Sequence, residues 1–255
     1  MCRGILKRFH FVIATAFALG IAALVCRDAA WFTVVVLGFF IVMGLGITIP
    51  QLRLFGNFIC SGKWSKKQVA LTFDDGPDPR STPQLLDLLR EEKIPAAFFC
   101  IGKHVEKNPE LTARILREGH LVENHSFTHS NLTNFYGRSQ LRTELVQAQE
   151  AIQKACGVAP KFFRPPVGLS NPNTFRVADE LNLQVIGWNI RSFDTITAAP
   201  QKIVERVRRN LWPGSIILLH DGNIPAEKLL VTVKSLLDTL RGLGYQVVRL
   251  DELLK

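Results

Sequence analysis

Thr72-Phe73-Asp74-Asp75-Gly76-Pro77 ends an apolar run that begins at Val69 and is typical of a buried strand. Side chains on a strand alternate between its faces, so adjacent carboxylates share a side only where the strand ends and the backbone bends. Gly76 and Pro77 supply such a bend. An isolated stretch of this kind would suit a surface turn equally well. Here we interpret it as two acids at a strand mouth, one free to bind a metal ion and the other to act as a base.

His125 and His129 support the metal interpretation. They follow the short apolar stretch 121–124, so they also lie at the C-terminal end of a predicted strand. Two histidines four residues apart share a face if the segment forms a helical turn. Two histidines at this spacing, without a further ligand, more often belong to the polar surface. With Asp75, however, the pair forms a two-His, one-carboxylate set with open positions, which is typical of catalytic zinc.

Three further segments carry groups suited to amide hydrolysis, which needs an activated nucleophile, oxyanion stabilisation and a proton for the departing nitrogen. Phe163–Gly168 offers an arginine followed by a rigid turn whose amides can bind an oxyanion. Gly187–Asp194 ends a strand with an aromatic residue and an acid. Ser215–Gly222 is predicted to be a buried strand that ends in a histidine.

From Lys67 to Lys255 the chain resembles the polysaccharide deacetylases (NodB-homology domain, carbohydrate esterase family four). These are metal-dependent hydrolases that remove N- or O-acetyl groups from sugars. All of the family's motif positions are recognisable in order in the segments above. The resemblance implies an α/β fold, an irregular (β/α) barrel of about seven strands with its active site at the strands' C-terminal ends.

The resemblance implies a metal centre with its own base. Asp75, His125 and His129 match the metal ligands. Asp74 matches the general base, and Arg164 matches the residue that holds this base in place. Zn²⁺ is the expected metal, although a two-His, one-carboxylate set also accepts Co²⁺, Mn²⁺, Ni²⁺ or Fe²⁺.

The remaining matches concern the leaving group and the acyl group. Asp194 matches the acid that tunes the catalytic histidine, and His220 matches the general acid that protonates the leaving amine. The Val167 amide falls at the position of the oxyanion donor. Trp188 and Leu218 match the walls of the small pocket that takes the acyl methyl group.

Three positions depart from the family pattern. Val167 replaces a tyrosine, Arg191 replaces the first acid of the fourth motif, and Thr195 replaces a tryptophan. None of these changes removes a ligand or a proton-transfer group, but they leave open whether the sugar groove matches that of polymer-cleaving members. The rival hypothesis, an inactive carbohydrate-binding relative, requires a lost ligand or proton donor.

Outside the motifs, strand patterns alternate with helix patterns, which favours a parallel sheet or barrel. Strands are predicted at 96–101 and 246–249, the latter before a short helix, and longer helices at 109–118, 140–155, 199–210 and 226–242. Another helix is predicted to begin at the Ser-Thr-Pro sequence of residues 81–83. His104 and His120 are predicted to be surface or loop residues.

The first fifty residues contain two apolar runs, Phe9–Cys26 and Ala29–Ile49. A membrane helix needs about 20 apolar residues. We therefore predict a membrane hairpin over residues 1–50, a juxtamembrane linker over 51–67 and a catalytic domain over 68–255. The alternative is a signal peptide followed by one anchor, because basic residues precede the first run. That run ends without a small-x-small cleavage site.

Charge and cysteine content favour a cytoplasmic catalytic domain. Basic residues flank both ends of the hairpin while its turn holds only Arg27, and the positive-inside rule then places both flanks in the cytoplasm. An odd number of cysteines, five, suits a reducing compartment. The net charge of +9 comes without a basic stripe interleaved with aromatics, so we expect anionic lipid headgroups rather than nucleic acid as the partner.

The short linker points to a substrate near the membrane. Even fully extended, it keeps the site within about 60 Å of the bilayer. We expect N-deacetylation or N-deformylation of a polyprenyl-phosphate-linked or glycolipid amino sugar at the cytoplasmic face. The alternative is deacetylation of peptidoglycan or exopolysaccharide outside the membrane. The sequence does not indicate which oligomeric state the protein has.

Overall fold

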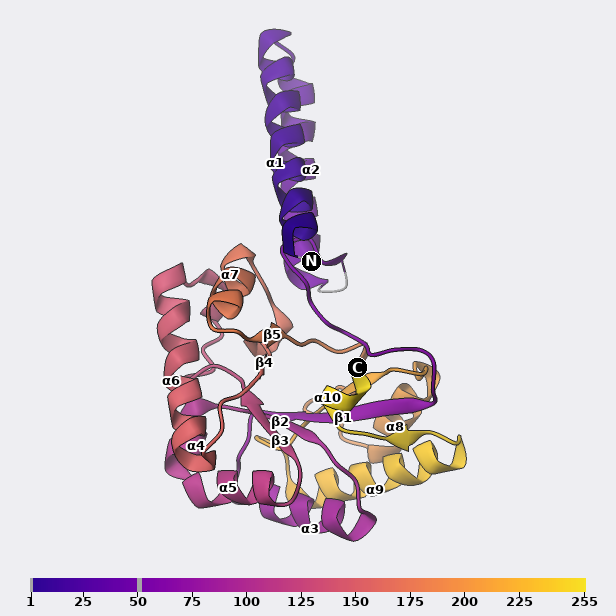
Figure 1. Ribbon diagram of the computed structural model, residues 1–255. Coiled ribbons are helices and arrows are strands. Elements are labelled where there is room, and N and C mark those ends of the chain that lie inside the picture. The colour runs from indigo at the N-terminus through magenta and orange to yellow at the C-terminus, as the bar shows by residue number, and fades with distance from the viewer. Residues whose placement is uncertain (1, 50–51) are drawn as a thin grey trace.

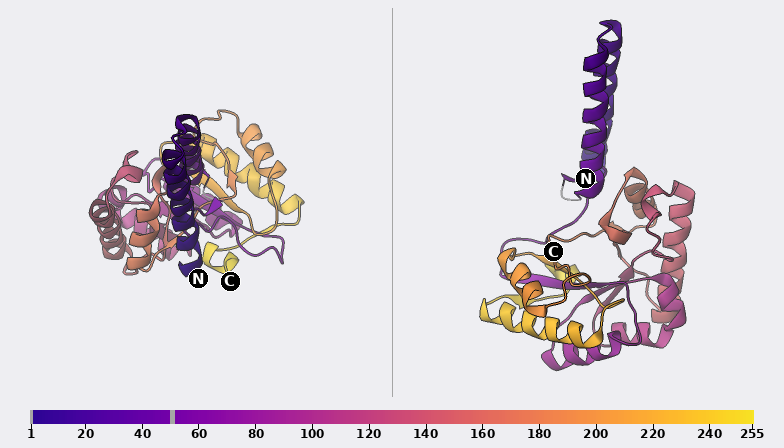
Figure 2. Two further views of the ribbon diagram at one scale, coloured as in Figure 1. Left: turned by 90° about the horizontal axis from the view of Figure 1, so that it is seen from above. Right: turned by 180° about the vertical axis from the view of Figure 1, so that it is seen from behind.

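A helical hairpin and an α/β domain make up the chain in the computed structural model, which describes residues 2–49 and 52–255 (Figure 1). Helices α1 (Cys2–Val25) and α2 (Ala29–Thr48) lie side by side and project together from the domain (Figures 1 and 2). Asp28 caps α2, because its carboxylate accepts the Trp31 N–H at 2.9 Å. The two apolar runs therefore form two antiparallel helices joined by a tight turn.

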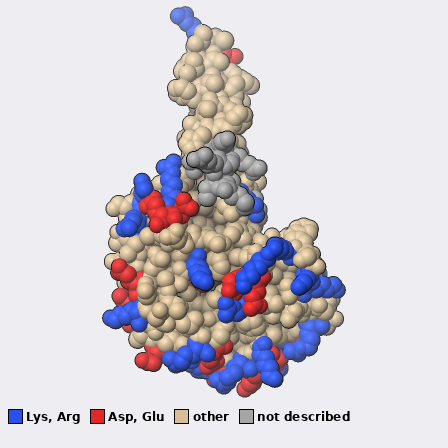
Figure 3. Space-filling model, in the orientation of Figure 1, with Lys and Arg blue, Asp and Glu red and all other residues tan. Residues whose placement is uncertain are grey.

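Only α2 is both long and apolar enough to cross a membrane among the described residues, with a mean hydropathy of 2.4. The apolar part of α1, Phe9–Val25, is shorter. Figure 3 shows charged side chains at the tip of the hairpin and tan, uncharged atoms along the part of it that is not drawn in grey, whereas the domain surface mixes both signs of charge. By length and composition, α2 could therefore be a membrane span or part of a signal sequence, and the predicted two-helix hairpin is supported only in part.

The domain is built on one curled parallel sheet with the strand order β5-β4-β3-β2-β1-β7-β6, while β8 pairs with β1. This confirms the predicted α/β fold, an irregular barrel. Its strands are β1 (Gln68–Asp74), β2 (Ala97–Cys100), β3 (Leu121–Asn124), β4 (Phe162–Phe163), β5 (Gln184–Val185), β6 (Ile190–Arg191), β7 (Ile216–His220) and β8 (Gln246–Val247).

Helices cover the outer face of this sheet (Figure 1). They are α3 (Thr82–Glu92), α4 (Gly102–Lys107), α5 (Pro109–Arg117), α6 (Arg138–Cys156), α7 (Pro172–Glu180), α8 (Pro200–Arg209) and α9 (Ala226–Gly242). The short α10 (Leu250–Leu253) packs on the other face of the sheet, in a cluster with Ala70, Ala97 and Phe99. The sequence predicted all of these except α4, which is only six residues long, and α7. Helix α7 begins with a capping box between Asn171 and Thr174, a start signal that the sequence does carry.

Strand β1 lies in the middle of the sheet, and its register places the chemistry at one edge. Val69, Leu71 and Phe73 point into the main hydrophobic core beneath the helices. Asp74, the last residue of β1, is level with His220 at the end of β7. Since all these strands are parallel, the residues that follow them gather at the same C-terminal edge.

Residues 58–62 pair with the sheet, although the sequence predicted them to be part of a linker outside the domain. Ile59 forms a parallel bridge with Ile186, and Ser61 forms an antiparallel bridge with Ser215. Phe58 is almost fully buried in a core cluster between the sheet and α6 and α7. The predicted linker of residues 51–67 therefore includes residues that belong to the folded domain.

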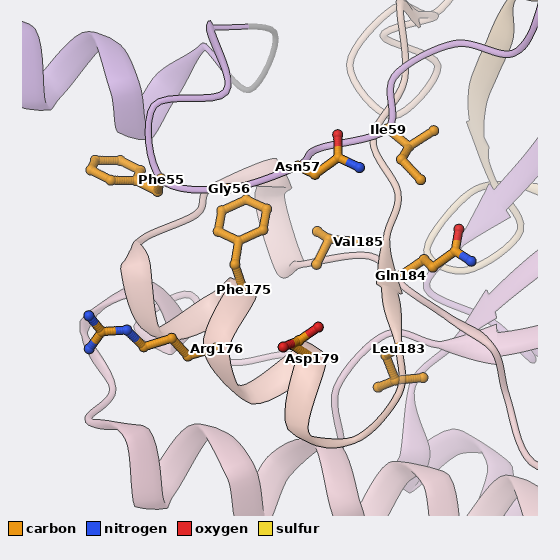
Figure 4. Close-up of a pocket in the computed structure, with 10 residues that line it drawn as sticks. All are labelled: Phe55, Gly56, Asn57, Ile59, Phe175, Arg176, Asp179, Leu183, Gln184 and Val185. Carbon is orange, nitrogen blue, oxygen red and sulfur yellow. The ribbon is translucent and has the colours of Figure 1, made fainter. Parts of the chain in front are cut away.

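A pocket of about 210 Å³ lies where this segment meets α7 and β5 (Figure 4). Phe55 lines it from the segment that follows α2, and Phe175, Leu183 and Val185 line it from the domain. Gly56 passes so close to Phe175 that a Cβ would lie 1.9 Å from the ring, so only glycine fits there. Phe55 also packs edge-on against Phe9 of α1, at 5.4 Å between ring centroids. The junction thus links hairpin and domain.

Candidate active site

Asp74 and Asp75 end β1 with different orientations, as the sequence predicted. Asp74 is buried and still belongs to the strand, whereas Asp75 has a left-handed backbone with φ of 73°. This turn of the backbone lets the neighbouring carboxylates reach one site. Burial alone would raise the pKa of Asp75, but His125, His129 and His220 beside it lower that pKa to about 2.

His125 and His129 bring their imidazoles to Asp75, but not through a helical turn. The segment after β3 is a loop, and His129 has a left-handed φ of 53°. The Nε2 atoms of His125 and His129 lie 3.5 Å and 3.2 Å from Asp75 Oδ1. The segment was predicted to be a helical turn, and this prediction was wrong. The two imidazoles come together because positive φ angles at Ser126 and His129 curl the loop.

These three side chains suit a metal ion. Their ligand atoms all lie within 4.8 Å of one another, and Asp75 Oδ1 is buried without a hydrogen-bond partner. The His125 Nδ1–H donates to the Arg164 carbonyl at 2.7 Å, which leaves the lone pair of Nε2 free to point at the cluster. A buried acceptor that faces two imidazole lone pairs lacks only a cation between them.

Arg164 is completely buried and holds Asp74 in place. Its NH1 donates to Asp74 Oδ1 at 2.7 Å and to the Thr72 hydroxyl at 2.9 Å, while NH2 donates to the Gly187 carbonyl at 3.0 Å. Its guanidinium also stacks 4.0 Å above the Phe99 ring. A buried positive charge therefore pairs with the Asp74 carboxylate and fixes its orientation beside the cluster.

Asp194 and His220 form a second hydrogen-bonded pair in the site. The His220 Nδ1–H donates to Asp194 Oδ1 at 2.7 Å, and the His220 backbone N–H donates to Oδ2 at 2.8 Å. Burial would lower the pKa of His220, but the hydrogen bond to Asp194 and the nearby carboxylates raise it to about 9. His220 is therefore protonated at neutral pH and can donate a proton.

Val167, Trp188 and Leu218 lie beside these groups. Val167 has a φ of 60° and sits in a 3₁₀ turn, Pro166–Gly168. At Gly168 a Cβ would lie 2.2 Å from the Trp188 ring, so the turn is pressed against that ring. Leu218 is buried on β7 two residues before His220, and thus on the same face of the strand. All ten predicted site residues therefore gather at one edge of the sheet.

The sequence analysis missed several supporting residues. His104, predicted to be a surface or loop residue, lies on α4 with its Nδ1–H hydrogen-bonded to the Asp75 carbonyl at 2.9 Å. Asp221 is buried, donates its N–H to the Asp74 carbonyl at 3.1 Å and accepts the Thr82 hydroxyl at 2.5 Å. Burial raises the pKa of Asp221 to about 7. Asp221 directly follows His220 at the end of a predicted strand, and this position was the signal in the sequence that could have identified it.

His120 was also predicted to be a surface or loop residue, and this prediction was wrong. The residue is buried against Phe98, and its Nδ1 accepts the Ala96 N–H at 3.2 Å. Burial lowers its pKa to about 4, so it is a neutral core histidine. It precedes β3 and is therefore at the opposite end of the strand from the candidate site.

Comparison with known proteins gives consistent matches. The polysaccharide deacetylase family profile matches residues 61–186. A peptidoglycan-N-acetylglucosamine deacetylase of Bacillus cereus is 37% identical over 193 residues, 75% of this chain and 90% of the relative. A chitooligosaccharide deacetylase of Bradyrhizobium sp. is 37% identical over 187 residues, 72% of this chain and 85% of the relative. The chain spans only 58% of a second Bacillus cereus peptidoglycan-N-acetylglucosamine deacetylase, at 38% identity over 160 residues, 63% of this chain.

Solved structures agree with these matches. A crystal structure of a peptidoglycan N-acetylglucosamine deacetylase superposes with a TM-score of 0.74 at 32% identity, covering 77% of this chain and 92% of that one. A family-four carbohydrate esterase pseudoenzyme from Bacillus anthracis superposes with a TM-score of 0.73 at 27% identity, covering 78% and 69%. Because the fold is shared with a pseudoenzyme, activity must be argued from the site residues themselves.

Proposed function

This chain belongs to the polysaccharide deacetylase family, and we propose that it removes an N-acyl group from an amino sugar in a metal-dependent hydrolysis. One observation carries the proposal: the Asp75, His125 and His129 cluster lies beside the buried Asp74 carboxylate, and Asp74 is level with His220, which is paired with Asp194. An inactive relative would lack a ligand or a proton donor, and every such group matched here is in place.

Asp75, His125 and His129 would hold the divalent metal, with Zn²⁺ the expected ion. When bound, such an ion polarises the acyl carbonyl and lowers the pKa of water to about 7. Asp74 takes a proton from the attacking water, and Arg164 holds Asp74 in place for that task. The charge that develops on the carbonyl oxygen is then met by the Val167 N–H.

His220 completes the reaction on the other side of the scissile bond. It donates a proton to the departing nitrogen as the carbon–nitrogen bond breaks, while Asp194 fixes its orientation through Nδ1. Trp188 and Leu218 form apolar walls that would take the acyl methyl group. The expected fragment is a small acyl group, acetyl or formyl.

The His220–Asp194 pair predicts a pH effect. His220 acts when protonated, so kcat should be high below its pKa and fall as the pH rises through it. Burial lowers the pKa of His220, and Asp194 opposes this through its hydrogen bond and its charge, together with Asp74 and Asp75, so that the pKa is about 9. Asp194→Asn removes the Asp194 charge and should lower this pKa. The alkaline limb of the kcat profile should therefore move to lower pH, and activity at pH 8 should fall more than activity at pH 6. Unchanged limbs in both Asp194→Asn and His220→Ala would show that His220 is not the acid.

The substrate that we propose is a lipid-linked or glycolipid amino sugar at the cytoplasmic face. Its support is the apolar α2 and the pairing of residues 58–62 with the sheet, which together would hold the domain close to the bilayer if α2 spans it. A short connection raises the effective concentration of a substrate delivered in the membrane plane. In this proposal residues 1–50 form the anchor and residues 68–255 the catalytic domain. Peptidoglycan or another polymer outside the membrane is the second candidate, favoured by the named relatives.

A reporter fused after Lys255 separates these two substrates. Alkaline phosphatase is active only where its disulfides form, outside the cytoplasm. We expect the phosphatase fusion to be inactive and a green fluorescent protein fusion at the same position to be fluorescent. An active phosphatase fusion would place the domain outside and support the polymer substrate.

A further inference from the structure

Glu144 is a carboxylate on the apolar face of α6. Leu141, Leu145 and Ala148 are buried on the same face, and Glu144 itself is only 8% exposed. An acid in such a place is costly unless hydrogen-bond donors surround it. The donors that Glu144 meets belong to the loop that carries two of the proposed metal ligands.

Three hydrogen bonds join Glu144 to this loop. Its Oε2 accepts the Phe127 N–H at 3.1 Å and the Thr128 N–H at 2.8 Å. Its Oε1 accepts the Thr128 hydroxyl at 2.8 Å. Phe127 and Thr128 lie between His125 and His129, so the carboxylate is hydrogen-bonded to the middle of the loop that carries both histidines. Hydrogen bonds to an ionised acceptor are stronger than those between neutral groups.

The loop has a backbone conformation that needs such support. Ser126 and His129 have φ angles of 60° and 53°, in the left-handed region that side chains with a Cβ disfavour. The first two residues of α4 donate their N–H groups to the carbonyls of Ser126 and Phe127, at 2.9 Å and 3.0 Å. Glu144 satisfies the N–H groups of Phe127 and Thr128. Helices α4 and α6 thus hold the loop through its acceptors and its donors respectively.

We propose that Glu144 is a positioning residue for His125 and His129, fixing the loop so that both imidazoles face Asp75. This inference rests on the proposed metal site and adds to it a carboxylate from a helix that supplies none of the three ligands. Groups that orient metal ligands are typically worth about 10- to 100-fold in metal affinity. Glu144 exerts its effect through the loop backbone and does not touch the substrate.

The test compares Zn²⁺ affinity in the full-length protein and in Glu144→Gln, both in the same detergent, by competition with a chromophoric chelator. Glutamine keeps the size of the side chain but replaces one acceptor oxygen with an NH₂ group that cannot accept. We expect Zn²⁺ affinity to fall about 10- to 100-fold. Glu150→Gln, an exposed acid on the same helix, is the matched control and should bind Zn²⁺ like the wild type.

Thr128→Val is the milder variant, because it keeps the carboxylate and both backbone donors. Losing one hydroxyl hydrogen bond should weaken Zn²⁺ binding about 2- to 10-fold, and this variant decides the question if Glu144→Gln does not fold. Turnover lost at limiting Zn²⁺ should return at saturating Zn²⁺, since all three ligands remain.

Zn²⁺ affinity equal to that of the wild type in folded Glu144→Gln, or in Thr128→Val alone, would overturn the positioning role. A lower unfolding temperature of the metal-free protein with unchanged affinity would show that Glu144 is merely structural. Failure of the wild type itself to bind Zn²⁺ would instead overturn the proposed metal site, and the positioning role with it.

Discussion

Asp74→Asn is expected to keep its bound metal and to lower kcat about 10²- to 10⁴-fold, the usual contribution of a general base. Asparagine has the same shape and its oxygen can still accept the hydrogen bond that Arg164 NH1 gives at 2.7 Å. The metal ligands are untouched, whereas the group that accepts the proton of water is gone. Metal content and turnover measured on the same sample therefore separate the two adjacent acids.

Asp238→Asn provides the control for this variant, because Asp238 is an exposed acid on α9. It should match the wild type in both metal content and turnover. Loss of the metal from Asp74→Asn would show that the roles of Asp74 and Asp75 have been assigned the wrong way round.

Much of the site was predictable because its residues follow parallel strands. Asp74, Asp75 and His220 each stand at the end of an apolar run that the sequence shows clearly. In a parallel sheet such ends meet at one edge, whatever the details of the loops. The order of the motifs then supplied the resemblance, which the family match and the sheet bear out.

The loops and the short strands were not predictable in the same way. His125 and His129 have a spacing that a helical turn would satisfy, and no rule of spacing indicates the positive φ of Ser126. Strands β4 and β5 contain two residues each, too few for a period to appear, whereas the equally short β6 and β8 lie within segments that the sequence did predict as strands. Residues 58–62 pair by isolated bridges, so their place in the sheet depends on distant partners.

Glu144 is a residue whose burial the helix pattern of α6 indicates. It occupies a position where the spacing of Leu141, Leu145 and Ala148 calls for an apolar residue. A charge on such a face indicates a buried partner, although the pattern alone does not say which loop supplies it. His104 offers no comparable signal, since its contact with the Asp75 carbonyl depends on the conformation of the turn after β1.

The Asp75→Asn, His129→Ala double variant is expected to lose bound metal and, with it, all measurable deacylation. Two of the three ligands are removed, so the remaining His125 cannot hold the ion alone. The loss should exceed that of Asp74→Asn, because both the activated water and the polarised carbonyl depend on the ion. Metal analysis and acetate release from an N-acetylated amino sugar measure the two effects.

Folding of the double variant is checked by its thermal unfolding in the metal-free state. Asp75 and His129 lie in loops at the sheet edge, outside the hydrophobic core, so the unfolding temperature should stay close to that of the metal-free wild type. Deacylation that survives in the folded double variant would rule out the metal mechanism.

Titration of the metal-free wild type with Zn²⁺, while acetate release from an N-acetylglucosamine oligosaccharide is followed, tests metal-dependent deacylation most directly. We predict no activity without metal, a linear rise with added Zn²⁺ and a plateau at one ion per chain, the number that the Asp75, His125 and His129 cluster can hold. Acetate release by the metal-free protein, or none at full occupancy on this or a lipid-linked N-acylated amino sugar, would contradict the account.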